Sequence, residues 1–130
     1  VALRTEAGMG LITGRTGSFA VHVWSEHYQE PIAAKAEGAL CDSLGCIATT
    51  DRFSVAVIRN GAAFAEDCGR NDLVIARIRA PATCTGSQVI DAGALAAGGV
   101  HWLRWDDGAA RFDIRTAIPN LTRPWRVVPR

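Results

Sequence analysis

The chain lacks the features that mark several large classes of protein. No stretch approaches the ~18–20 consecutive apolar residues that a membrane-spanning helix needs, and the first residues do not have the charged-then-apolar order of a signal peptide. There is also no excess of charge of one sign, because 14 Lys and Arg against 13 Asp and Glu give a net charge of +1. Free-standing nucleic-acid-binding proteins usually carry a strong basic excess. A bound anion would therefore have to lie at a local patch.

Sequence signatures of catalysis are also missing. The three histidines are His22, His27 and His101, and none belongs to an H-x-H, H-x-x-x-H or H-E-x-x-H motif, whereas a zinc enzyme usually needs three protein ligands of defined geometry. No G-x-S-x-G elbow is present. The glycine segments at 8–10 and 14–17 lack the lysine of a phosphate-binding loop and the spacing of a dinucleotide fingerprint. We therefore expect no metal, no cofactor and no catalytic residue within this chain.

The composition is that of an ordinary globular protein. The chain has 130 residues, of which 48% are hydrophobic and 21% are charged. A chain of this length can bury about two-thirds of its unfolded surface and so build a hydrophobic core. No linker or internal repeat is visible, so we expect a single domain over 1–130.

Strand-like segments alternate with short helix-like segments along the chain. The expected strands are 2–5, 11–13, 19–24, 46–50, 53–58, 73–78, 88–90, 100–105 and 111–117. The expected helices are 32–40, 62–69 and 92–97. Hairpin turns are predicted at 51–52 and 106–108. This order predicts an α/β fold, with a mixed sheet covered by short helices.

The four cysteines leave three alternatives open. They are Cys41, Cys46, Cys68 and Cys84, and no two of them form a C-x-x-C pair. An even number of cysteines fits two disulfides in an oxidising compartment. The alternatives are four buried thiols, or a metal site ligated by all four cysteines.

A basic strip with aromatic residues is predicted on strands near the end of the chain. Trp102 and Trp105 are an odd number of residues apart, so they lie on opposite faces of one strand, one in the core and one outside. The strand segments carry five arginines: Arg77, Arg79, Arg104, Arg111 and Arg115. Such a strip could contact single-stranded nucleic acid by base stacking and phosphate contact. The alternative is a solvated sheet face whose arginines pair with Asp106, Asp107 and Asp113.

The middle of the chain resembles a known family. The segments that carry the resemblance are CDSLGC at 41–46, AFAEDC at 63–68, DLVI at 72–75, Ala80-Pro81 with Cys84, VID at 89–91 and GGVH at 98–101, followed by an arginine- and proline-containing tail. In this order they are similar to the C-terminal soluble region of alphaproteobacterial ComEC-family competence proteins. These are polytopic inner-membrane proteins that pass one strand of incoming DNA through the membrane during natural transformation.

The resemblance implies a fold and a role. In many ComEC proteins the soluble region resembles a metallo-β-lactamase domain, proposed to degrade the strand that is not transported, and this chain would correspond to its later half. The H-x-H-x-D-H signature of that domain is absent here. We therefore expect a degenerate, non-catalytic accessory domain that works with the membrane-channel portion of the same polypeptide. The alternative is part of a metal-dependent nuclease whose zinc ligands lie upstream.

The same resemblance gives an expected location, with the parent protein in the bacterial inner membrane and this domain in the periplasm. The chain does not begin with Met, and we expect it to be a piece of a longer protein. In the periplasm disulfides persist, and we prefer the pairs Cys41–Cys46 and Cys68–Cys84, because each closes the shorter loop.

Weak contact with single-stranded DNA is the expected partner interaction. The predicted contact residues lie on the last hairpin: Arg104, Trp105, Arg111 and Arg115.

Overall fold

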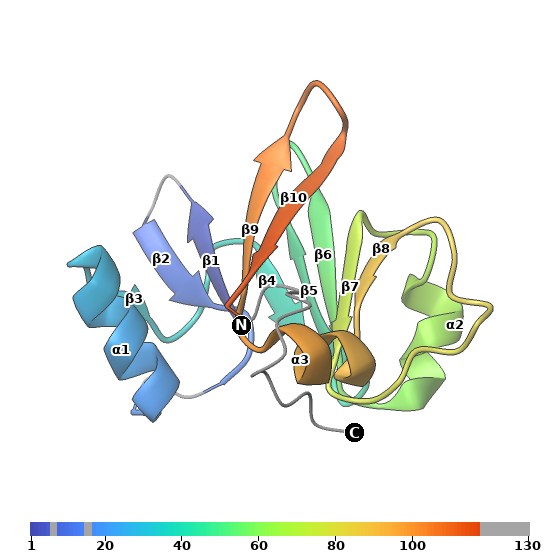
Figure 1. The fold of residues 1–130 in the computed structure, drawn as a ribbon, viewed down its shortest axis with the longest axis horizontal. Helices are drawn as coiled ribbons and strands as arrows, with labels where there is room; N and C mark the ends of the chain where they lie inside the picture. Colours follow the sequence, from blue (N-terminus) through green and yellow to red (C-terminus); the bar gives the residue numbers. More distant parts are fainter. Residues whose placement is uncertain (6–7, 15–16, 118–130) are drawn as a thin grey trace, which may run out of the picture.

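A five-stranded mixed sheet forms the centre of the computed structural model, which describes residues 1–5, 8–14 and 17–117 (Figure 1). The arginine- and proline-containing tail lies outside these residues. The strands lie in chain order: β4 (Ala39–Cys41), β5 (Gly45–Thr49), β6 (Ser54–Ile58), β7 (Leu73–Ala76) and β8 (Gln88–Ile90). β4, β5 and β6 are antiparallel, whereas β6, β7 and β8 are parallel. The predicted mixed α/β architecture is confirmed.

Both faces of this sheet are buried around β6 and β7, and β6 contributes to each face in turn, whereas Leu40 of β4 and Ile47 of β5 are exposed. Val55 and Val57 belong to one core cluster, and Ala56 and Ile58 belong to the other. This explains why the central strands are almost continuously apolar. The second cluster is covered by the short helices η1 (Gly61–Ala63) and α2 (Phe64–Asp67). The first is covered by the remaining C-terminal elements, which are α3 (Ala92–Gly98), β9 (His101–Asp106) and β10 (Arg111–Thr116).

Side-chain caps fix the starts of two of these helices, η1 and α3. The Asn60 side chain accepts a hydrogen bond from the Ala62 backbone N–H at the start of η1. The Asp91 side chain accepts a hydrogen bond from the Ala94 backbone N–H at the start of α3. Each cap satisfies a backbone N–H that has no partner within the helix. The predicted hairpins at 51–52 and 106–108 are confirmed, since β5 pairs with β6 and β9 with β10.

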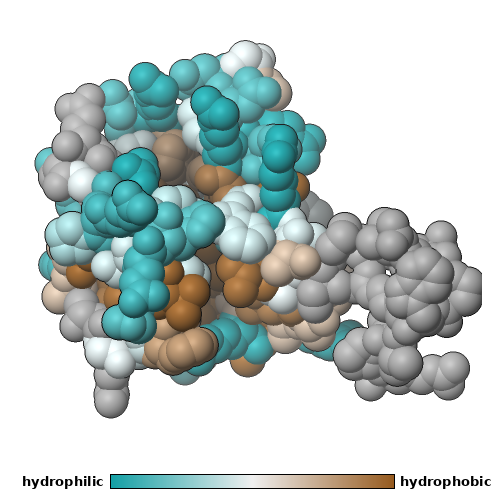
Figure 2. All heavy atoms as spheres, turned by 60° about the vertical axis from the view of Figure 1, so that its left-hand side comes forward, coloured by the Kyte–Doolittle hydropathy of each residue, from teal (hydrophilic) through white to brown (hydrophobic). Residues whose placement is uncertain are grey.

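A smaller unit made by the first third of the chain lies beside the central sheet (Figure 1). It contains β1 (Ala2–Thr5), β2 (Gly8–Leu11), β3 (Ile32–Ala33) and α1 (Phe19–Tyr28). Figure 2, which brings this side forward, shows hydrophobic atoms exposed between hydrophilic ones. No helix in the described part of the chain is long and apolar enough to cross a membrane.

The prediction of a strand at 19–24 is wrong, because this segment is the start of α1. Phe19, Val21 and Val23 alternate, but only Val21 is buried, and Phe19 is 83% exposed. The residues that face inward follow the helical period instead, with Trp24 and Tyr28 half-buried beyond Val21. The Ser18 side chain caps the helix by accepting from the Val21 N–H. A local cap and a helical spacing of inward side chains therefore override the apparent alternation.

The prediction of a helix at 32–40 is also wrong. Its first residues form β3, parallel to β2, and its last residues begin β4. Gly38 has φ +79°, a conformation that interrupts a helix, and Gly10 faces the backbone at Ala36, where a Cβ atom would lie 2.5 Å from the Ala36 Cα. Close packing of the extended chain against Gly10 thus outweighs the helix propensity of an alanine-rich segment. The strand expected at 11–13 lies slightly earlier, at β2.

Candidate functional site

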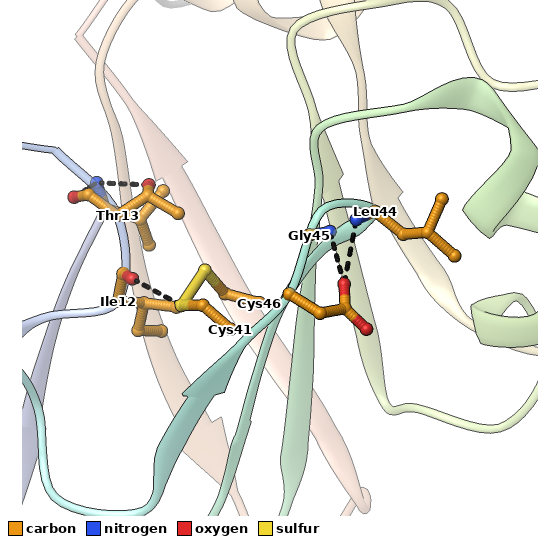
Figure 3. The surroundings of a disulfide bond; sticks show 8 residues. Ile12, Thr13, Cys41, Leu44, Gly45 and Cys46 are labelled. Atoms are coloured by element: carbon orange, nitrogen blue, oxygen red, sulfur yellow. Dashed lines mark hydrogen bonds between the residues drawn. A yellow bond between two sulfur atoms is a disulfide. The ribbon is translucent and has the colours of Figure 1, made fainter.

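The first disulfide, Cys41–Cys46, closes the hairpin between β4 and β5 (Figure 3). Its two residues are directly opposite each other in the ladder. The tight turn between them is held by the Asp42 side chain, which accepts hydrogen bonds from the Leu44 N–H at 2.8 Å and the Gly45 N–H at 3.1 Å. Cys46 is 1% exposed and belongs to the main core. This disulfide therefore joins a surface turn to the core of the sheet.

The second disulfide, Cys68–Cys84, joins the end of α2 to the loop between β7 and β8. The same loop is held a second time by the Ser87 hydroxyl, which accepts from the Gly69 N–H and donates to the Asn71 carbonyl. Both pairs are those that the shorter-loop argument prefers, and no cysteine is free. The structure therefore contains neither four free thiols nor a metal site ligated by the four cysteines.

The three histidines have separate surroundings. His22 lies within 3.2 Å of Glu26 on the exposed side of α1, and the His27 ring contacts the ring of Tyr28. The His101 ring, near the start of β9, lies 2.7 Å from the Gly99 carbonyl oxygen through its Nδ1 atom. Among residues 1–5, 8–14 and 17–117, no three His, Cys, Asp or Glu side chains are grouped so as to hold a metal ion.

The β9–β10 hairpin has one apolar face and one charged face. On the apolar face, Trp105 packs against Phe112 and Phe53, with ring centroids 5.1 and 5.5 Å apart. Its indole N–H donates to the Asp107 side chain at 2.8 Å. The prediction that one tryptophan enters the core and the other stands outside is thus confirmed, with Trp105 inside and Trp102, 42% exposed, outside.

This arrangement corrects the predicted DNA-contact set. Arg104, Arg111 and Arg115 are exposed on the outer face, whereas Trp105 points to the opposite face. The aromatic side chain that accompanies the arginines is Trp102, which lies directly opposite Arg115 in the ladder. The alternation of side chains along a strand could have favoured Trp102, because residues two apart, such as Trp102 and Arg104, lie on the same face.

Carboxylates share the outer face with these arginines. Arg104 lies opposite Asp113 and Arg111 opposite Asp106 in the ladder. The Arg115 Nε atom is 4.0 Å from the Asp113 Oδ2 atom, so Asp113 partly offsets the charge of this arginine. Arg77 and Arg79, the other two arginines of the predicted strip, follow β7 and are not on the hairpin. The charged strip is thus confined to one hairpin face, on which Arg115 lies beside both Asp113 and Trp102.

Comparisons with protein-family models, with curated proteins and with solved structures find no match to this chain.

Proposed function

We propose that this chain is a non-catalytic, periplasmic accessory domain of a ComEC-like DNA-uptake channel, and that it contacts the passing single strand through the outer face of the β9–β10 hairpin. The observation that carries the proposal is the position of Trp102, Arg104, Arg111 and Arg115 on one exposed face. An exposed indole beside guanidinium groups offers base stacking together with phosphate contact. Two disulfides and no free cysteine fit an oxidising compartment such as the periplasm.

The proposal includes a degenerate metallo-β-lactamase-like origin for the fold. What supports it is the order from β6 to β8, in which three neighbouring strands run parallel, with η1 and α2 between β6 and β7 and with α3 after β8. A nuclease of that type needs closely spaced histidines and carboxylates. In the described residues the histidines lie apart, with no metal-holding group around them. The side chains of the described residues therefore fit a non-catalytic role, whereas the nuclease alternative takes its zinc ligands from upstream of this chain.

Fluorescence anisotropy with a labelled single-stranded oligonucleotide, measured at several salt concentrations, tests the contact. Because the net charge is only +1, we expect weak binding that is lost as salt rises. The double variant Arg111→Ala/Arg115→Ala removes two phosphate contacts and should lower the salt slope by roughly 1.4, at ~0.7 per contact. The control pair Arg59→Ala/Arg70→Ala removes the same charge from exposed positions outside the hairpin and should leave the slope unchanged.

The stacking contribution has its own matched pair of variants. Trp102→Ala should weaken binding by at least about fivefold, since stacking of one base is worth roughly 1–3 kcal/mol. Phe19→Ala removes an exposed aromatic side chain from α1 and should have no effect. If the wild-type chain binds no single strand even at the lowest salt, the DNA contact is refuted and a purely structural role takes its place. Cleavage of the oligonucleotide in added Zn²⁺ or Mn²⁺ would favour the nuclease alternative.

A further inference from the structure

The outer edge of β10 has an unpaired position. Among residues 1–5, 8–14 and 17–117, β10 pairs with β9 alone. The backbone N–H and C=O of Phe112 turn away from β9 and bind the Gln88 side chain, at 2.6 Å to Oε1 and 3.0 Å to Nε2. Because backbone groups alternate sides along a strand, the N–H and C=O of Ile114 also face away from β9. Within the described part of the chain, neither has a hydrogen-bond partner.

The space beside this edge is open. A concavity of about 430 Å³ extends from Ile114 toward the hairpin turn and is lined by Gln88, Asp106, Ala109, Arg111, Phe112, Asp113 and Ile114. Arg115 lies beyond it and is exposed. An open strand edge is a template for pairing with another strand. The Gln88 side chain already occupies the edge at Phe112, so a pairing strand has access to Asp113, Ile114 and Arg115.

The sequence of β10 is self-complementary in one antiparallel register. If Ile114 lies opposite Ile114 of a second copy, Asp113 of each chain lies opposite Arg115 of the other. The neighbouring register, centred on Asp113, would place two aspartates opposite each other and Arg111 opposite Arg115. Opposite charges directly across a strand pair stabilise it, and like charges destabilise it. The register centred on Phe112 is blocked by Gln88.

We propose that the chain self-associates through antiparallel β10–β10 pairing centred on Ile114, with Asp113–Arg115 ion pairs on both sides of the two-fold axis. The two Ile114 residues exchange a pair of backbone hydrogen bonds. On the outer face each Asp113 lies opposite an Arg115, so no like charges lie opposite each other. On the inner face the two Ile114 side chains lie next to each other across the two-fold axis. Three residues of each chain pair, so the dimer is weak and exchanges with monomer. This self-association is argued from the strand edge and does not rest on the proposed DNA contact, although both involve Arg115.

Sedimentation velocity of the disulfide-bonded chain, at concentrations up to about 1 mM, tests this pairing. The wild-type protein should shift toward dimer as its concentration rises. Arg115→Asp turns two attractive pairs into two repulsive ones and should weaken association by about tenfold. The charge-swapped double variant Asp113→Arg/Arg115→Asp restores both opposite-charge pairs and should restore association. Arg59→Asp, with the same charge change on an exposed residue after β6, should associate like wild type.

A second measurement keeps the test independent of how the variants fold. In the wild-type protein, hydrogen exchange of the Ile114 amide should slow as the concentration rises, whereas exchange at other exposed edges should not. A protein that stays monomeric at the highest concentration overturns the proposal. So does a dimer that is insensitive to Arg115→Asp, or one that the charge swap does not restore.

Discussion

The two disulfides should contribute unequally to stability, because they close loops of different length. The cysteines are 5 residues apart in Cys41–Cys46 and 16 apart in Cys68–Cys84. In the chain-entropy account, a cross-link removes from the unfolded state an entropy of about 2.1 + 1.5R ln n cal/mol/K for a loop of n residues. At 25 °C this gives about 2 kcal/mol for the shorter loop and about 3 kcal/mol for the longer one.

Simple cysteine replacement would not isolate this difference. Cys46 is 1% exposed, whereas Cys68 and Cys84 are half-buried, so alanine at position 46 adds the cost of a core cavity. We therefore compare each double-alanine variant with itself, oxidised and reduced. The variant that lacks Cys41 and Cys46 retains only the longer loop, and the variant that lacks Cys68 and Cys84 retains only the shorter one. The cavity is then common to both redox states.

Urea denaturation, with and without a phosphine reductant, gives the free energy of unfolding in each state. Reduction should cost about 3 kcal/mol in the variant with only Cys68–Cys84 and about 2 kcal/mol in the variant with only Cys41–Cys46. A difference of about 1 kcal/mol is roughly fivefold in the folding equilibrium constant. The reasoning is refuted if reduction costs as much, or more, in the variant that keeps the shorter loop.

Two further predictions concern single side chains that bind backbone groups. Gln88→Ala leaves the N–H and C=O of Phe112 without their partner and should lower the free energy of unfolding by about 1–2 kcal/mol in urea denaturation; an unchanged value would mean that the hairpin is held by its aromatic contacts alone. Asp91 accepts hydrogen bonds from Ala80 and Ala94, which lower its pKa, and Asp91→Ala should cost about 1 kcal/mol at neutral pH. The pKa of Asp91 is lower in the folded than in the unfolded chain. The stability that Asp91 adds over alanine is therefore present above the ordinary carboxyl pKa and is lost as pH falls through the lowered pKa of the folded state. Urea denaturation of the wild-type protein and of Asp91→Ala, from neutral to acid pH, checks this.

The elements from β5 onward were predictable because their signals are local. The hairpin at 51–52 has turn residues between two apolar runs, and η1 and α3 begin at Asn60 and Asp91, whose side chains cap them. Each signal lies within a few residues of the element that it defines. Contacts between distant segments therefore altered the predicted elements little in this part of the chain.

The first third could not be predicted in the same way, because its propensity and periodicity signals are ambiguous. β3 exists only because Ile32 and Ala33 pair with β2, more than 20 residues earlier in the chain. The segment 19–24 alternates like a strand, yet it begins a helix whose inward side is set by Val21, Trp24 and Tyr28. Propensity and period were ambiguous at both places. Pairing with β2 decided the first, and the Ser18 cap together with the helical spacing of inward side chains decided the second.

The sequence placed the arginines of the candidate site on the correct hairpin, but it named the wrong tryptophan to accompany them. Alternation along β9 places Trp102 on the face of Arg104 and Trp105 on the opposite face. The buried side of Trp105 agrees with this, because Trp105 completes an aromatic cluster with Phe53 and Phe112. The exposed arginines were correctly expected on the hairpin, since alternation with Phe112 and Ile114 leaves only one face for them.

The groups that stabilise the fold and the groups proposed for contact lie on different parts of the molecule. The disulfides are in the β4–β5 hairpin and in the loop after β7, whereas the exposed arginines and Trp102 lie on the outer face of β9 and β10. The hairpin is attached through its other face, by the Trp105 cluster and by Gln88. Substitutions at the outer arginines should therefore change DNA binding with little change in stability. Reduction of the disulfides should change stability, and it should affect binding only to the extent that the chain unfolds.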